Sequence, residues 1–333
     1  MLSFIADHTM VSQGSDIKHV WVEPVPQLMN NMLKSCAVEG NVEPISIPGY
    51  WMDKEGMDIP IGAPPKQGEK VIYFLHGGGY VRFSASPHDR IANVPRDMLK
   101  HCKSVKRAFL LEYRLSRVLS NPPENPFPAA LLDALAGYIY LTQDVGFSPA
   151  DIVVEGDSAG GNLAHALTRY LVENRGMEGL PAPPGAMILL SPWVDLTASD
   201  NFPGSSIYAN DGVDFIRYIT APSDSYSGKA FLGPLGAKGA LDRYISPASA
   251  DPRMPPVSFA GFPRTLVISG EAEVLRTQIE VLVKKMVKDM GAGRDDGQVE
   301  YYESPDSVHD FLVIMHHEPE RTQTLRIIAD WLD

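Results

Sequence analysis

The stretch that decides the fold is Asp151-Ile-Val-Val-Glu-Gly-Asp-Ser-Ala-Gly-Gly-Asn-Leu-Ala164. Its short apolar run predicts a strand that is buried on both faces, and the residues from Ala159 onward have helical spacing. Gly156-x-Ser158-x-Gly160 lies at the junction. Small residues two before and two after a serine suit a sharp turn in which strand and helix come too close for a Cβ. We therefore expect Ser158 to stand exposed as a nucleophile. A Gly- and Ser-rich turn that only caps the helix is the plain alternative.

Similar short apolar runs recur on both sides of this segment, and helical patterns separate them. The runs are residues 71–75, 108–111, 152–154, 187–190, 265–268 and 299–302, and the helical patterns are 128–141, 159–171 and 273–290. Alternation of strand and helix predicts an α/β fold, in which a mostly parallel sheet carries helices on both faces.

Two regions interrupt this alternation, residues 1–45 and residues 196–256. The first contains a helical pattern over 26–37 whose apolar face includes Met29 and Met32. The second is too long for a plain connection. Neither has enough apolar content for a core of its own. We therefore expect a single domain over residues 1–333 with both regions forming a cap, and a tail plus a surface loop is the alternative.

The composition excludes several classes of protein. The 333 residues include 44% hydrophobic and 21% charged residues, which is typical of a globular chain. With 29 Lys and Arg against 41 Asp and Glu, the net charge of −12 argues against nucleic acid and anionic lipid as partners. Cys36 and Cys102 are too few for a disulfide framework or a thiolate zinc site. The first twenty residues lack the basic region of a signal peptide, and the longest apolar stretch, 129–141, is too short to cross a bilayer. We therefore expect a cytoplasmic protein without stable membrane insertion.

A second motif, His76-Gly77-Gly78-Gly79-Tyr80, directly follows the apolar run 71–75. Three glycines leave backbone N–H groups unshielded, and such groups can bind an oxyanion beside a nucleophile. A phosphate-binding loop is the main alternative. Neither Gly-Lys-Ser/Thr nor Gly-x-Gly-x-x-Gly is present here, so we do not favour it.

A serine nucleophile needs a histidine base, and His309 is the best placed candidate. It lies in a loop just past the last apolar run, where it would face the catalytic edge of the sheet. His316 and His317 are expected inside the following helix beside Glu318. A metal site built from these three is not favoured, because adjacent residues point to different faces of a helix.

The base in turn needs a carboxylate that orients it. Glu271 and Glu273 both follow the run 265–268, and spacing alone does not choose between them.

Together these motifs resemble those of the hormone-sensitive-lipase-like branch of the α/β-hydrolase superfamily, from about residue 70 to the C-terminus. The resemblance implies the α/β-hydrolase fold with a helical cap. It places Glu273 in the acid position of a Gly-x-x-Asp-Pro-Leu motif, which reads Gly270-Glu-Ala-Glu-Val-Leu275 here. It also implies that Gly78, Gly79 and Ala159 donate the oxyanion hydrogen bonds. Two departures are the glutamate in place of the usual aspartate and an insertion at 116–122.

The function that follows is that of a serine carboxylesterase, acting through an acyl-enzyme on an apolar small-molecule ester of short to medium acyl chain. We expect no metal or organic cofactor. Substrate contacts are expected from Tyr80, Met29, Met32 and Phe215. A lactonase, amidase or acyltransferase with the same triad stays open, as does a homodimer. A non-catalytic receptor of this fold is disfavoured because all three triad positions are filled.

Overall fold

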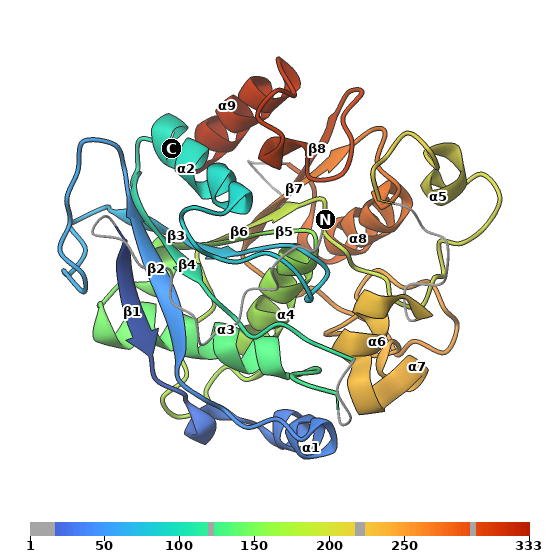
Figure 1. The fold of residues 1–333 in the computed structure, drawn as a ribbon, viewed down its shortest axis with the longest axis horizontal. Coiled ribbons are helices and arrows are strands. Elements are labelled where there is room, and N and C mark those ends of the chain that lie inside the picture. Colours follow the sequence, from blue (N-terminus) through green and yellow to red (C-terminus); the bar gives the residue numbers. More distant parts are fainter. Residues whose placement is uncertain (1–16, 119–122, 217–223, 294–297) are drawn as a thin grey trace.

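The computed structural model describes residues 17–118, 123–216, 224–293 and 298–333. These residues form one sheet with the strand order β1-β2-β4-β3-β5-β6-β7-β8 (Figure 1). The strands from β3 to β8 pair in parallel, and β1 and β2 add an antiparallel edge next to β4. The strands are β1 (Lys18–Val22), β2 (Ile47–Asp53), β3 (Lys70–Leu75), β4 (Val105–Leu111), β5 (Ile152–Asp157), β6 (Ala186–Leu190), β7 (Arg264–Gly270) and β8 (Val299–Ser304).

The predicted α/β fold with a mostly parallel sheet is confirmed, and all six predicted runs are strands. The two antiparallel strands were not predicted. β2 contains Pro48 and Gly49, which weaken the sequence signal of a strand. The tertiary structure explains the glycine, because a Cβ at position 49 would lie 2.2 Å from the ring of Phe109 on β4. β1 lies inside the segment 1–45 that the sequence assigned to the cap, so part of that segment belongs to the sheet.

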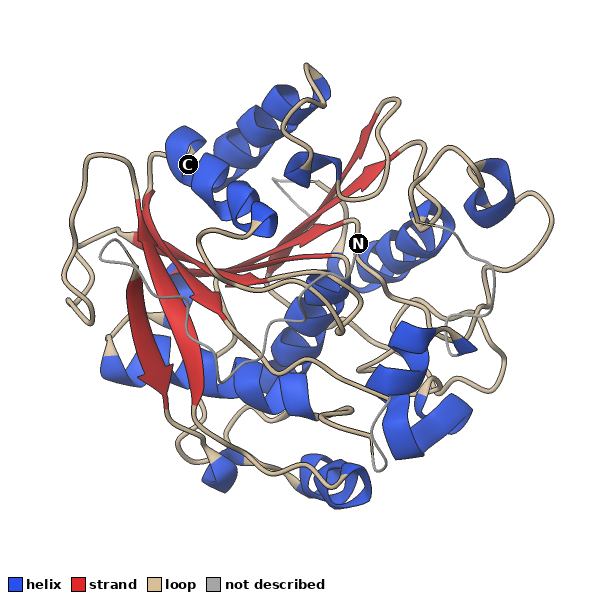
Figure 2. Ribbon diagram, in the orientation of Figure 1, coloured by secondary structure: helices blue, strands red, loops and turns tan. Residues whose placement is uncertain are grey.

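Helices cover both faces of the sheet (Figure 2). The longer ones are α2 (Asn93–His101) and α9 (Glu320–Leu332) on one face, and α3 (Ala129–Ile139), α4 (Ala159–Glu173) and α8 (Arg276–Met290) on the other. Side chains alternate along each strand, so Tyr73 and Val154 enter the core under α3 and α4, whereas Ile72 and Val153 enter the core under α2 and α9. This is why the strands are continuously apolar in sequence.

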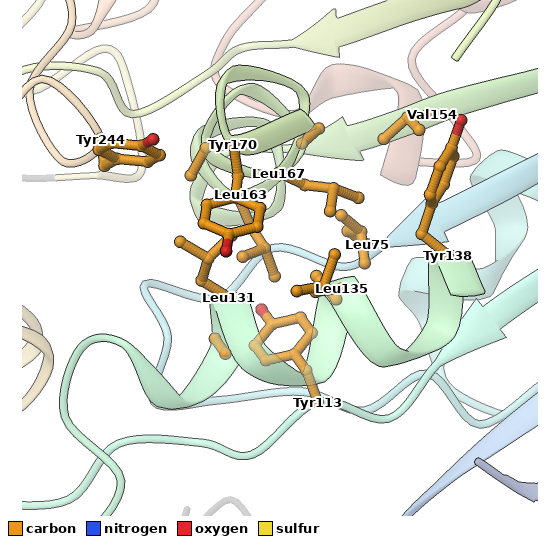
Figure 3. Packing of buried hydrophobic residues seen from close by; sticks show 14 of the residues in the cluster. Leu75, Tyr113, Leu131, Leu135, Tyr138, Val154, Leu163, Leu167, Tyr170 and Tyr244 are labelled. Atoms are coloured by element: carbon orange, nitrogen blue, oxygen red, sulfur yellow. The ribbon is translucent and has the colours of Figure 1, made fainter. Parts of the chain in front are cut away.

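The core between α3 and α4 fixes the position of α4, the helix that follows Ser158. Figure 3 shows Leu131 and Leu135 of α3 next to Leu163 and Leu167 of α4. Each of these buried leucines stabilises the fold by about 1.5–3 kcal/mol. Ser158 is therefore attached to a rigid helix rather than to a free loop.

The remaining helices are short and lie mostly in the two irregular regions. The predicted helix 26–37 is a single turn, η1 (Pro26–Leu28), followed by α1 (Asn31–Gly40), because Asn30 caps α1 by accepting the N–H of Leu33 at 2.9 Å. Residues 196–256 contain α5 (Ser206–Ala209), α6 (Tyr226–Leu232), η6 (Gly233–Leu235) and α7 (Gly236–Gly239). Short turns elsewhere are η2 (Arg90–Ala92), η3 (Tyr140–Asp144), η4 (Pro149–Asp151) and η7 (Phe311–Val313). The cap role of these regions stays a prediction.

In the part of the chain that the structure describes, every helix is too short or too polar to cross a membrane.

Candidate active site

Ser158 stands at a sharp turn between the end of β5 and the start of α4. Its backbone has φ 52° and ψ −116°, which is a strained conformation for a residue with a side chain. Gly160 and Gly156 make the turn sterically feasible. A Cβ on Gly160 would lie 1.8 Å from the carbonyl oxygen of Leu75, and one on Gly156 would lie 2.3 Å from the carbonyl oxygen of Gly160. The close approach of strand and helix expected from the sequence is therefore present.

His309 follows β8 and reaches across to the serine. Its Nε2 lies 3.0 Å from Oγ of Ser158, and the imidazole is only 2% exposed. At this distance the serine hydroxyl can donate to the ring nitrogen, which is the geometry that a nucleophile and its base need. The sequence placed these two side chains at the same sheet edge, and the structure brings them into contact.

Glu273 lies against the other nitrogen of the same ring. Its Oε2 is 3.7 Å from Nδ1 of His309, and its side chain is completely buried. Glu271, the alternative left open by spacing, is exposed, and its carboxylate accepts the N–H of Asp306 at 3.3 Å. The geometry therefore favours Glu273 as the carboxylate that orients His309.

Burial and neighbouring charges act in opposite directions on this pair. Burial raises the pKa of Glu273, and the contact with His309 partly offsets that rise. Burial lowers the pKa of His309, but the carboxylates of Asp310 and Glu273 raise it by more, so it lies well above its usual value. The two neighbouring acids thus favour the imidazolium form of His309 and oppose the effect of burial.

The glycine loop after β3 lies beside the serine turn. Gly78 and Gly79 have φ values of 109° and 63°, which favour glycine. Their N–H groups, like that of Ala159 at the first position of α4, donate to no other residue that the structure describes. Gly77 has a different role, because its N–H donates to Oδ1 of Asp157 at 2.9 Å and ties the loop to β5. Three donors are therefore free to bind an oxyanion.

The four residues expected to contact substrate have different positions. Phe215 lies at the site, with its ring centroid 5.9 Å from that of His309 and its side chain 63% exposed. Tyr80 is buried, and its hydroxyl donates to Oδ1 of Asn162 at 2.8 Å, so its contact with substrate stays a prediction. Its ring stacks on Phe231 of α6 at 3.8 Å, so Tyr80 ties the glycine loop to the region 196–256.

Met29 and Met32 pack into the core at the other end of α4. The neighbouring Asn30 donates its N–H to the hydroxyl of Tyr170, which is twelve residues beyond Ser158, or about 18 Å along the helix axis. Of the four candidates, the structure brings only Phe215 into ring contact with His309.

The position of His316 and His317 also differs from the expectation. Both precede α9, which begins at Glu320, because Pro319 stands before its first turn. His317 Nε2 lies 2.9 Å from Oγ of Ser307, and this hydrogen bond stabilises the loop that carries His309. Among the residues described, no group of three or more His, Cys, Asp and Glu side chains is arranged to hold a metal ion.

Sequence reasoning missed Asp310, which contacts His309, and Ser191, which contacts Asp310. Asp310 places its Oδ2 3.0 Å from Nε2 of His309, and its N–H donates to Oγ of Ser191 at 3.2 Å. The only sequence signal for Asp310 was its place next to the base in His309-Asp-Phe311.

The chain is similar in sequence to known proteins. The chain is 29% identical over 230 residues to an acetyl-hydrolase of Streptomyces hygroscopicus, which covers 68% of this chain and 64% of that protein. It is 27% identical to esterase LipU of Mycobacterium tuberculosis, over 81% of this chain and 80% of that protein. The match to the first of these relatives thus spans slightly less than two thirds of its length.

Solved structures extend the similarity over most of the chain. An esterase of the bacterial hormone-sensitive lipase family matches with a TM-score of 0.64 and 25% identity, over 97% of this chain and 86% of that one. A hormone-sensitive lipase from a metagenome library matches with a TM-score of 0.64 and 27% identity, over 85% of this chain and 81% of that one. The resemblance expected from the motifs is confirmed. Residues 72–313 match the model of the alpha/beta hydrolase fold, and the chain belongs to that family.

Proposed function

We propose that this protein hydrolyses carboxylic esters through an acyl-enzyme on Ser158. The observation that carries the proposal is the 3.0 Å contact between Ser158 Oγ and His309 Nε2 at a strained turn. A serine held in this way next to a base is activated for attack on a carbonyl carbon. The relatives named esterase and acetyl-hydrolase support the same chemistry.

In the first step, Nε2 of His309 takes the hydroxyl proton while Oγ of Ser158 forms a bond to the ester carbon. Glu273 steadies the imidazolium that results, because its carboxylate faces Nδ1. The same Nε2–H then protonates the alcohol as the C–O bond breaks. Water repeats the sequence on the acyl-enzyme, releases the acid and restores Ser158.

The oxyanion of each tetrahedral intermediate would be bound by the N–H groups of Gly78, Gly79 and Ala159. A single donor of this kind contributes about 2.7–4 kcal/mol to the stabilisation of the transition state. The glycine loop is held in place before substrate arrives, since Gly77 is anchored on Asp157. Little reorganisation is then needed during the reaction.

We propose an apolar small-molecule ester of short to medium acyl chain as substrate. The exposed ring of Phe215 beside His309 supports an apolar contact at the site. The acetyl-hydrolase among the relatives supports a small acyl group. Outside β1, which belongs to the sheet, the regions 1–45 and 196–256 remain our proposal for the cap. A cytoplasmic location and a homodimer remain predictions.

Ser158→Ala tests the proposal. Turnover of p-nitrophenyl butyrate should fall by about 10⁴- to 10⁶-fold, because the nucleophile is lost. Ser148→Ala is the matched control, since Ser148 is an exposed serine in the loop before β5. A fluorophosphonate probe should label the parent protein at Ser158 only, as mapped by mass spectrometry. Substantial turnover in folded Ser158→Ala would remove this serine as nucleophile.

A further inference from the structure

Nε2 of His309 faces two oxygen atoms at the same distance. Oγ of Ser158 and Oδ2 of Asp310 each lie 3.0 Å from it. The proposed reaction uses only the first of these contacts. The second places a carboxylate beside the nitrogen that must accept the serine proton.

The backbone holds Asp310 in this position. Its φ of 49° and ψ of 36° are left-handed, and its N–H donates to Ser191 Oγ at 3.2 Å. The side chain is 12% exposed, and its second oxygen, Oδ1, is buried without a hydrogen-bond partner among the described residues. The contact with His309 is therefore the main polar contact of this carboxylate.

The titratable groups that face His309 are acids. Glu273 lies at Nδ1, Asp310 lies at Nε2, and Asp157 of β5 interacts electrostatically with His309. Glu155, two residues earlier on β5, is fully buried and is affected by both Asp157 and Asp310. Burial raises the pKa of Glu155 and of Asp157 well above the usual value, and the charge of Asp310 raises both further. Asp310 is thus the acid of this group with the closest contact to the base.

A carboxylate beside Nε2 favours the forms of the imidazole that carry a proton there. Those forms donate Nε2–H to Asp310 and have no lone pair for the serine hydroxyl proton. Glu273 also stabilises the imidazolium through its charge, but it faces Nδ1, so among the neutral tautomers it favours the one in which Nε2 is free to accept. The two acids therefore favour opposite neutral tautomers of His309, and only Asp310 competes with the serine hydroxyl for Nε2.

We propose that Asp310 is a positioning residue that holds a proton on Nε2 of His309 in the resting enzyme and thereby sets the pH above which the esterase is active. The inference rests on the proposed function. Activation requires the Nε2 proton to leave for solvent, which frees the electron pair that then accepts the proton of Ser158. During turnover, Asp310 faces the Nε2–H that passes to the departing alcohol.

The sign of the pH effect follows from the charge. Removing an anion next to His309 makes its protonated form less stable, so the base becomes free at lower pH. An opposite charge at such a distance typically moves a pKa by about one to three units. The ascending limb of kcat/KM against pH should therefore move to lower pH by about one to three units in Asp310→Asn. Asn suits this test because it tolerates the left-handed backbone and keeps the shape of the side chain.

The experiment compares three proteins from about pH 5 to about pH 10 with p-nitrophenyl butyrate. Asp306→Asn is the matched control, because Asp306 is exposed, lies in the same loop and also has a left-handed φ of 51°. Its profile should coincide with that of the parent. An active Asp310→Asn with an unshifted limb would overturn the role of Asp310 and leave the esterase proposal intact. Turnover by Ser158→Ala would instead overturn the esterase proposal.

A second readout does not depend on activity. In the Ser158→Ala protein, the ¹⁵N chemical shift of Nε2 reports directly whether His309 carries a proton there. The titration midpoint should fall by about one to three pH units when Asp310→Asn is added. Asp310→Gly serves the same purpose if the Asn variant fails to fold, because glycine adopts this backbone without strain. An unchanged midpoint in a folded variant would refute the proposal.

Discussion

Replacing Glu273 by glutamine tests the assignment of the acid most directly. Glutamine keeps the size of the side chain and removes its charge. At the observed 3.7 Å between Oε2 and Nδ1, and at an effective dielectric constant of about 20, the charge stabilises the imidazolium by about 4.5 kcal/mol. Since about 1.4 kcal/mol corresponds to a tenfold change in rate, kcat/KM should fall by about 10³-fold. At the pH plateau, where Nε2 of His309 is free of its proton, the imidazolium forms only as the serine attacks, so the loss should fall mainly on kcat.

The assay is steady-state hydrolysis of p-nitrophenyl butyrate at the pH plateau of each protein, with circular dichroism as the check on folding. Glu271→Gln is the control, because Glu271 is exposed and bonded to the N–H of Asp306 rather than to His309. Its kcat/KM should stay close to the parent value. A folded Glu273→Gln protein within about threefold of the parent, where about 10³-fold is expected, would refute the argument from distance and charge. The acid would then have to be sought elsewhere.

Three further tests have defined outcomes. His309→Ala should lower kcat/KM by about 10⁴-fold or more, whereas His317→Ala should lower only the melting temperature, and equal losses of activity would contradict the assignment of the base. Gly160→Ala should prevent accumulation of folded protein, because its Cβ would lie 1.8 Å from the carbonyl oxygen of Leu75, and a normal melting curve would show that the turn can relax. Glu155→Gln should reduce the loss of stability at rising pH. Burial raises the pKa of Glu155 well above its ordinary value of 4.5, so the folded state keeps a proton that the unfolded state releases, and the free energy of unfolding of the parent falls as pH rises above about 4.5. Melting temperatures across this range provide the measurement, and identical slopes for the two proteins would contradict the expectation.

Much of the fold and half of the site were predictable because their signals are local. A strand covered on both faces must be apolar at successive positions, and β5 shows this directly in its sequence. The turn at Ser158 needs small residues at fixed offsets because the chain meets itself there, as the positions of Gly156 and Gly160 show. Local signals of this kind do not specify the order of the strands in the sheet. β2 was not predicted because the reason for its glycine is not local. Gly49 is required by the ring of Phe109, which lies on β4.

The side chains that complete the site depend on contacts between distant parts of the chain. The sequence alone determined the sheet type, the turn at Ser158, the glycine loop and the loop that carries His309. Each of these features is encoded within a few neighbouring residues. Spacing left Glu271 and Glu273 open, the motif resemblance favoured Glu273, and the tertiary structure shows that Glu273 faces His309. Only the tertiary structure decided that Tyr80 is buried against α6 and that Asp310 reaches Nε2. The physical reason is that the direction of a side chain in a turn is set by what packs around it. The pKa of His309 likewise depends on its burial and on the nearby charges of Asp310 and Glu273. These surroundings form only when the chain has folded.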